Sequence, residues 1–262
     1  MEARQRLCDD FGMDILFLTV SSSLPHDRLF GYRLFSLDEI SQWVAEDHGL
    51  LVSVVVDGPF QRLAQKIGVQ SLLRKWGTVE VMGAMTEESI QVGQVVTACL
   101  KCKPDALVIA DDIAYQHSTY VSHRDLEQSL FASYRGWVQQ AHDRGILVFF
   151  HSDGNLTSVL PDLLVCGFDG LAGCELQSQD VPAFKRQYGS RLTFLTGVPS
   201  YLLDEEELGL RHQKQFTGLL TTLASGGRFV LCSSRGLSSA KHLSRLRTLY
   251  QWADEAWNPS TI

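Results

Sequence analysis

The chain has 262 residues, of which 45% are hydrophobic, and its formal net charge at pH 7 is −7. This length suits one domain with a substantial core, since barrels of alternating strands and helices typically contain about 250 residues. The negative charge argues against nucleic acid or an anionic membrane as the main partner, because both attract basic surfaces. The longest apolar run, residues 50–56, is far shorter than the ~20 residues that span a bilayer. With no apolar segment behind the first residues, we expect a cytoplasmic protein with a single domain over residues 1–262.

Short apolar runs predict seven strands, because each has the length of a strand and is nearly continuous rather than alternating. Runs of this kind are typical of a parallel sheet that is covered on its outside. The expected strands are residues 14–20, 50–56, 105–110, 146–150, 168–171, 192–195 and 228–231.

Helical patterns with three- and four-residue apolar spacing lie between these runs, and capping residues mark several of their ends. Ser36 is expected to open one helix and Thr86 another, and glycines follow the ends of later ones. The later helices are expected over residues 125–144, 156–165, 181–188, 204–224 and 238–257. Strand and helix therefore alternate, which predicts an α/β fold of the (β/α)8 TIM-barrel type. The eighth strand is either irregular, near residues 77–83, or absent, so the barrel is expected to be incomplete or irregular near its start.

The most informative polar residues end the fourth predicted strand, where Leu-Val-Phe-Phe runs into His151, Ser, Asp153 and Gly154. Residues two apart on an extended segment face the same way. His151 and Asp153 can therefore supply two metal ligands, or a base with its orienting acid. The alternative is that the histidine ends the strand while Asp153 caps the next helix. We favour the site, because the carboxyl ends of barrel strands carry the active sites of this architecture.

A second group follows the third predicted strand, where Asp111 and Asp112 come directly after Leu-Val-Ile-Ala. Adjacent residues on a strand point to opposite sides, so at most one of them faces the mouth of the barrel. Both are retained as catalytic candidates, against the alternative of ion pairs with helix residues such as Arg124. Tyr115 and His117 follow in the loop as candidates for substrate binding.

Two further strand ends add a thiol and a carboxylate. Cys232 follows the last predicted strand, and a thiolate is a preferred ligand of zinc, although most buried cysteines are small core residues. Glu175 closes the fifth strand and is a further catalytic candidate. The pair Cys99 and Cys102 is expected to be two incidental thiols, because redox-active pairs need a helix N-terminus to lower the pKa. Three more residues complete the candidates for substrate binding: Phe60, Asn155 and Arg235.

Four segments of the chain together resemble a known family. They read ADDIAYQHSTYVS, VFFHSDGNLTSVLPDLLVCGFDGL, FKRQYGSRLTFLTGV and GGRFVLCSSRG. The resemblance is to the uroporphyrinogen decarboxylase superfamily, and within it to the corrinoid-dependent methyltransferases that use methylcobalamin. It covers residues 50–250.

The resemblance implies a (β/α)8 barrel whose site lies at the carboxyl ends of the strands. It implies a zinc ion that activates a thiol, or another small acceptor, to take a methyl group from a methylcobalamin carried by a partner corrinoid protein. The branch holds zinc with a His-x-Cys pair and a later cysteine. On this chain these positions are His151, Asp153 in place of the first cysteine, and Cys232.

The chain departs from the family at several points, and two other functions stay open. We do not expect the arginine-containing N-terminal loop with which the decarboxylases grip substrate carboxylates, and Thr196-Gly-Val-Pro199 stands where the family carries an acid. One alternative is a metal-independent decarboxylase or lyase that uses His151 and Asp153 as an acid–base pair on a small carboxylated substrate. The other is a non-enzymatic protein that binds a corrinoid or a tetrapyrrole.

Overall fold

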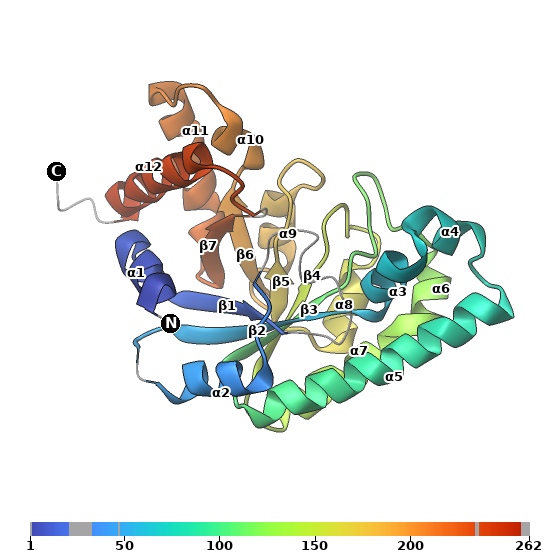
Figure 1. Ribbon diagram of the computed structural model, residues 1–262. Coiled ribbons are helices and arrows are strands. Elements are labelled where there is room, and N and C mark those ends of the chain that lie inside the picture. The colour runs from blue at the N-terminus through green and yellow to red at the C-terminus, as the bar shows by residue number, and fades with distance from the viewer. Residues whose placement is uncertain (1, 21–32, 47, 234–235, 258–262) are drawn as a thin grey trace.

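The computed structural model describes residues 2–20, 33–46, 48–233 and 236–257, which contain one parallel sheet (Figure 1). Its strands run side by side in chain order, each parallel to the next. The carboxyl ends of all the strands therefore lie at one edge. The strands are β1 (Ile15–Thr19), β2 (Leu51–Asp57), β3 (Ala106–Ala110), β4 (Leu147–His151), β5 (Gly170–Ala172), β6 (Thr193–Val198) and β7 (Phe229–Ser233).

Helices cover the outer face of the sheet, with α2 and α5 against β2, α7 against β4 and α11 against β6. Long α5 crosses the outside of the sheet (Figure 1). The helices are α1 (Glu2–Phe11), α2 (Leu37–Ala45), α3 (Pro59–Ile67), α4 (Val69–Arg74), α5 (Val79–Lys101), α6 (His123–Leu126), α7 (Ala132–His142), α8 (Leu160–Cys166), α9 (Val181–Tyr188), α10 (Ser200–Asp204), α11 (Leu210–Ala224) and α12 (Ala240–Trp257). A π-helical turn, Glu127–Phe131, joins α6 to α7.

The α/β fold with parallel strands and a TIM-barrel-like curl is confirmed, and all seven predicted strands are present. Within the described residues no eighth strand occurs, and β1 and β7 are the two edges of the sheet. The seven strands thus curl into a half-barrel. The segment 77–83, where the eighth strand could have lain, is instead a turn and the start of α5. The first strand is regular and pairs with β2 over its whole length.

Several helix boundaries differ from the prediction; the helix expected over residues 156–165, for example, begins only at Leu160. Ser36 opens α2 with a capping box, as predicted. Thr86 does not open a helix: the Thr78 side chain caps α5, and the Thr86 hydroxyl donates to the Met82 carbonyl inside it. The helix expected over residues 204–224 is broken between α10 and α11. Asp204 ends α10, where its carboxylate lies 3.0 Å from Nε2 of His242 on α12.

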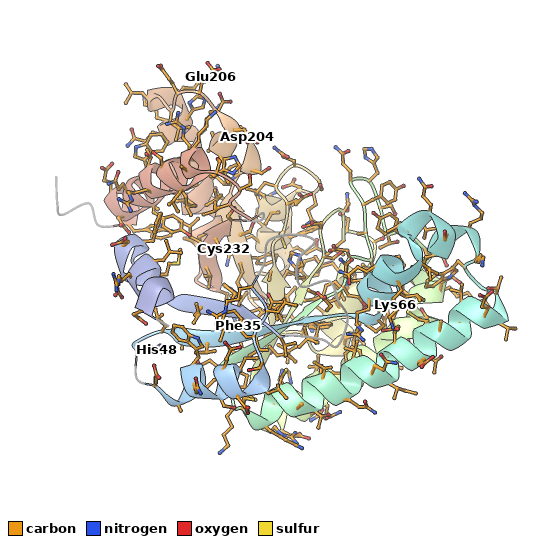
Figure 2. All side chains as sticks on the ribbon, viewed as in Figure 1. Phe35, His48, Lys66, Asp204, Glu206 and Cys232 are labelled. Atoms are coloured by element: carbon orange, nitrogen blue, oxygen red, sulfur yellow. The ribbon has the colours of Figure 1, made fainter. Side chains whose placement is uncertain are left out.

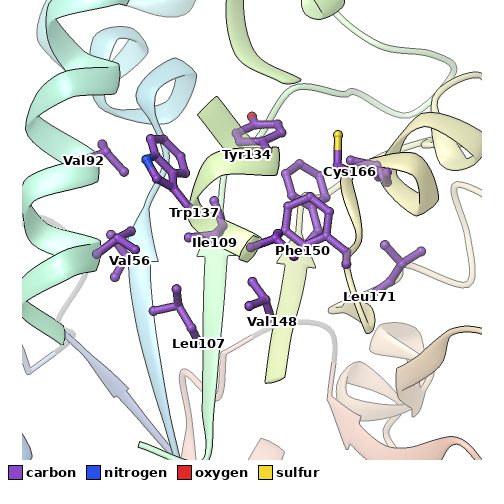
Figure 3. Packing of buried hydrophobic residues seen from close by; sticks show 14 of the residues in the cluster. Val56, Val92, Leu107, Ile109, Tyr134, Trp137, Val148, Phe150, Cys166 and Leu171 are labelled. Atoms are coloured by element: carbon purple, nitrogen blue, oxygen red, sulfur yellow. The ribbon is translucent and has the colours of Figure 1, made fainter. Parts of the chain in front are cut away.

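The two faces of the sheet differ in their packing. On the outer face Val56, Ile109 and Phe150 meet Tyr134 and Trp137 from α7 in a large buried cluster (Figure 3). The inner face, where the strands curl toward one another, carries a smaller buried cluster. Its members are Ala106, Val108, Phe149, Ala172 and Leu195, with Val55, Val230 and Cys232 packed against them. The alternation of strand side chains thus places His151, two residues beyond Phe149, on the inner face at the carboxyl end.

Candidate metal site

Three side chains that can bind a metal meet at the carboxyl ends of β3 and β4. Asp112, His151 and Asp153 each offer a ligand atom, and these atoms all lie within 4.8 Å of one another. The backbone N–H of Asp153 donates to Oδ1 of Asp112 at 3.0 Å, which joins the two loops. Around one ion with bonds of about 2.0–2.2 Å, ligand atoms are separated by roughly 3–4 Å. Movements of about an ångström would therefore let all three bind one ion.

The imidazole of His151 is already oriented for such a role. Its Nδ1 lies 2.9 Å from the carbonyl oxygen of Ala172. A carbonyl only accepts, so Nδ1 carries the proton, and Nε2 faces Oδ1 of Asp153 at 3.9 Å. Histidines that bind metals typically hold their second ring N–H in this way, because it fixes both the tautomer and the ring orientation.

Gly173 makes room for this imidazole. A Cβ at this position would lie 2.4 Å from Nδ1 of His151, and the residue has a φ of +73°. Gly173→Ala is therefore expected to displace the imidazole and weaken divalent-cation binding by about 10- to 100-fold, as a lost orienting contact does. Calorimetric titration with Zn²⁺ and Mn²⁺ measures the effect. Gly49→Ala is the matched control: its φ is +70°, but nothing lies within 4 Å of its Cβ. Equal affinities for the two variants would contradict this role of Gly173.

The electrostatics of the group favour a cation. Partial desolvation raises the pKa of Asp153 to about 6, although 55% of its side chain is exposed; His151 opposes the shift, and the charges of Asp112 and Glu175 add to it. Asp153 thus feels the charges of two other carboxylates as well as the imidazole, and an ion of charge +2 would relieve the repulsion among the carboxylates. The donors are oxygen and nitrogen atoms, which suit zinc, manganese, iron or cobalt in the divalent state.

Cys232, which the sequence predicted as a zinc ligand, is not among the side chains that the structure brings together. It lies on β7 (Figure 2) and packs against the inner-face cluster, but within the described chain it is not part of the group that can share an ion. Asp112 takes its place. β3 and β4 are neighbours, so Asp112 lies beside His151 and Asp153, whereas Cys232 comes from β7, three strands further along the sheet. Burial also raises the pKa of the Cys232 thiol to about 12, although a backbone hydrogen bond from Gly173 lowers it.

Asp111 has a structural role, which corrects its expected place among the catalytic residues. It is fully buried, and its carboxylate accepts hydrogen bonds from the backbone N–H of Phe60 (3.3 Å) and Gln61 (2.6 Å) and from the Tyr134 hydroxyl (2.6 Å). It thereby caps α3 from the end of the neighbouring strand. Gly58 is needed at this contact, since a Cβ there would lie 2.2 Å from Cγ of Asp111.

The burial of Asp111 predicts a pH dependence of stability. Burial raises its pKa to about 7, against the three hydrogen bonds that lower it. The folded protein therefore binds this proton more tightly than the unfolded chain, whose pKa is near 4. The stabilisation is complete below about pH 4 and is lost as the pH rises through about 7, by about 1.4 kcal/mol per pH unit at most.

The comparison with Asp111→Asn isolates this contribution, because asparagine does not titrate. The free energy of unfolding of the wild type minus that of the variant, measured by urea denaturation, is expected to fall between pH 4 and pH 7. A difference that stayed constant over this range would show that the pKa of Asp111 is ordinary.

Phe60 is also corrected: it is a core residue, 1% exposed, and its ring stacks on Tyr120 with the ring centroids 5.7 Å apart. It cannot contact a substrate without moving out of the core. The sequence could not reveal this, because Pro59 and Phe60 begin α3 and the direction of the first helical turn depends on how α3 packs against α5.

The other candidates lie in the loops around the metal group. Glu175 is half-buried and accepts a hydrogen bond from the Ser178 hydroxyl at 2.8 Å. Tyr115 is 43% exposed, and its ring packs edge-on against His117. The amide of Asn155 donates to the Ser178 carbonyl at 2.9 Å, which ties the loop after β4 to the loop after β5. The role of Arg235 stays a prediction, since this residue lies outside the described ones.

Two supporting residues escaped sequence analysis. The Ala172 carbonyl that orients His151 belongs to the backbone of a short apolar strand, and backbone acceptors leave no mark on residue type. Tyr134 lies in the middle of a helix with nothing in its surroundings to relate it to Asp111, 23 residues earlier. The sequence did contain one signal of the supporting shell: Gly173 lies two residues before Glu175, the carboxylate at the end of a predicted strand.

Comparisons with known proteins identify the fold. No protein-family model matches the sequence, and neither does any curated protein. Among solved structures, a methyltransferase from Methanosarcina mazei is similar with a TM-score of 0.64 and 19% identity. The match covers 84% of this chain and 64% of that one, so this chain spans less than two thirds of its length. An L-ribulose 3-epimerase is similar with a TM-score of 0.60 and 12% identity, covering 99% and 91%. At these identities the similarity shows a TIM-barrel-like fold. No helix among the described residues is long and apolar enough to cross a membrane.

Proposed function

We propose that this chain is a metal-dependent methyltransferase whose divalent cation is held by Asp112, His151 and Asp153. The observation that carries the proposal is the grouping of these three donors at the carboxyl ends of β3 and β4. In TIM-barrel-like folds, active sites are built at this end. The similarity in fold to the Methanosarcina mazei methyltransferase supports methyl transfer as the reaction class.

The residues fit a cation that keeps positions open for a substrate. Three protein ligands are the number found in catalytic zinc sites, where the remaining position takes water or substrate. A bound ion would lower the pKa of a substrate hydroxyl or thiol. Zinc is the proposed ion, although a set with one nitrogen and two carboxylate donors is harder than one that contains a thiolate.

The chain's own residues position the site. His151 is oriented by the Ala172 carbonyl, and Asp112 by the N–H of Asp153. Glu175, whose charge is felt by Asp153, is the carboxylate proposed to accept the proton that the methyl acceptor releases. Tyr115, His117 and Asn155 would contact the substrate from the surrounding loops. The methyl donor is proposed to be a methylcobalamin on a corrinoid protein that docks over the carboxyl ends of the strands, and the acceptor a small thiol.

One observation favours a second candidate, acid–base catalysis without a metal. Nε2 of His151 and Oδ1 of Asp153 are 3.9 Å apart, and the pKa of Asp153 is raised to about 6. A carboxyl group of this pKa exchanges protons near neutral pH. The pair would serve a decarboxylase or lyase acting on a small carboxylated substrate.

Elemental analysis followed by an assay with methylcobalamin separates these functions. About one equivalent of metal per chain is expected, with thiol-dependent loss of the methylcobalamin absorption band in the metal-loaded protein. His151→Ala and treatment with a chelator should both abolish the reaction. Metal far below one equivalent under metal-replete conditions would contradict the metal site. A chelator-insensitive reaction on a carboxylated substrate would favour the second candidate, and binding of methylcobalamin without turnover would indicate a corrinoid-binding protein.

A further inference from the structure

A pocket lies beside the metal group, at the same end of the sheet. It has a volume of about 680 Å³, within the range of small-molecule sites. The loops after β4, β5 and β6 form its walls together with α9, α10 and α11. The lining residues are Asn155, Thr157, Leu176, Gln177, Ser178, Gln179, Asp180, Pro182, Pro199, Tyr201 and Leu219. Asn155 lies two residues beyond Asp153, so the pocket and the metal group share one loop.

The lining excludes an anionic ligand. None of these described lining residues is a lysine, arginine or histidine, and the one carboxylate, Asp180, accepts a hydrogen bond from the N–H of Ala183 at 2.9 Å. Phosphates and carboxylates are recognised by cationic side chains or by several converging N–H groups. The amides and hydroxyls present here are instead suited to neutral groups that both donate and accept hydrogen bonds.

Gln179 indicates what the pocket has to supply. The residue is 7% exposed, and its Oε1 accepts a hydrogen bond from the backbone N–H of Leu156 at 3.0 Å. This bond fixes the orientation of the amide, because a flipped amide would place its NH₂ against that N–H. The Nε2 is then buried without a hydrogen-bond partner among the described residues. Buried donors of this kind are rare. Because Nε2 is closed off from solvent in this structure, a ligand oxygen would satisfy it once the Gln179 side chain shifts toward the pocket.

Tyr201 gives the pocket an aromatic face. It is 42% exposed and lies in the first turn of α10, next to Pro199. A polyol has hydroxyl groups on its edges and C–H groups on its faces. The edges match amides and a carboxylate, while the faces match an aromatic ring, prolines and leucines.

We infer that this pocket binds a neutral polyhydroxylated small molecule of the size of a sugar, one of whose hydroxyl oxygens accepts a hydrogen bond from Nε2 of Gln179. The inference goes beyond the proposed function, since it requires neither the metal nor methyl transfer. The geometry of the wall, the absence of cationic side chains from it and the orphaned amide carry it.

Binding to the whole chain, freed of metal with a chelator, tests the inference. The probes are D-fructose and myo-inositol as neutral polyols and D-fructose 6-phosphate as the anionic counterpart, followed by saturation-transfer NMR. Saturable binding of a neutral polyol is expected, with no gain from the phosphate. Gln179→Glu keeps an oxygen for Leu156 but removes the donor, and should weaken binding by about tenfold or more.

Gln140→Glu is the matched control. This glutamine also accepts a hydrogen bond through Oε1, from the Thr97 hydroxyl, but it lies on α7 away from the pocket, and its replacement should leave binding unchanged. If Gln179→Glu does not fold, Tyr201→Ala, on an exposed side chain, carries the test with an expected loss of binding. No binding of either neutral polyol, tighter binding of the phosphate, or equal binding by the Gln179 and Tyr201 variants and the wild type would overturn the inference. Because metal is absent throughout, these outcomes leave the metal site untouched.

Discussion

Asp111→Ala is expected to destabilise the protein by about 3 kcal/mol, while Asp112→Ala changes its stability by less than about 1 kcal/mol. Alanine at position 111 leaves three buried donors unpaired, namely two N–H groups at the start of α3 and the Tyr134 hydroxyl. Each such group costs about 1–3 kcal/mol. Part of this loss is offset, because the variant no longer buries a carboxylate whose pKa is raised to about 7. Asp112 is half-buried and accepts one backbone hydrogen bond, from Asp153.

Urea denaturation at pH 7 measures both changes, and thermal melting should show a decrease of roughly 6–12 °C for Asp111→Ala. Tyr134→Phe is the graded control: it removes one donor together with its need for a partner, and about 1 kcal/mol of stability is expected to be lost. The metal-binding pattern is expected to be the reverse, with Asp112→Ala defective and Asp111→Asn close to the wild type. Equal destabilisation by the two alanine variants would contradict the assignment of a structural role to Asp111 and a metal-binding role to Asp112.

This pair shows how far sequence reasoning can reach. The apolar run before it predicts a strand, and alternation along a strand predicts that only one of two adjacent acids faces the inner side. Which one does so depends on the loop geometry after β3, where Asp111 turns toward the start of α3. That direction is a tertiary property, and residue types do not encode it locally. His151 and Asp153, in contrast, share one segment, so their spacing alone predicts that they come together.

Cys232 illustrates the other limit. Its position at the end of β7 correctly predicts an inward-facing residue at the carboxyl end of the sheet. Whether it can reach His151 depends on the number of strands between them and on how tightly the sheet curls. An open sheet of seven strands curls less completely than a closed barrel of eight, and no run of residues in the sequence specifies that closure. The proximity of residues that share one segment was therefore predictable from the sequence, whereas the distance between residues on separate strands was not.

The ligand set is decided by three substitutions tested for metal binding. His151→Ala and Asp112→Ala are each expected to weaken binding of Zn²⁺ by about 100-fold or more, since losing an orienting contact alone costs 10- to 100-fold. Cys232→Ser should change the affinity by less than about threefold, because its sulfur is outside the group and its pKa of about 12 keeps it protonated. Calorimetric titration gives the affinities. Thermal melting provides a second measurement. At a free concentration of 100 Kd, Zn²⁺ should stabilise the wild type by about 3 kcal/mol and the first two variants much less.

His123→Ala is the matched control, because this histidine also pairs with a carboxylate, Asp162 at 2.9 Å, but is 53% exposed and belongs to α6. Its affinity for Zn²⁺ should equal that of the wild type. Three outcomes have different meanings. Loss of binding in the Cys232 variant, with Asp112→Ala unaffected, would restore the ligand set expected from the sequence and would require the sheet to close further than it does here. Loss in all three would indicate a four-ligand site with both kinds of donor. Binding by the wild type no tighter than by His151→Ala would leave His151 and Asp153 as an acid–base pair, because their 3.9 Å separation and the raised pKa of Asp153 do not depend on an ion.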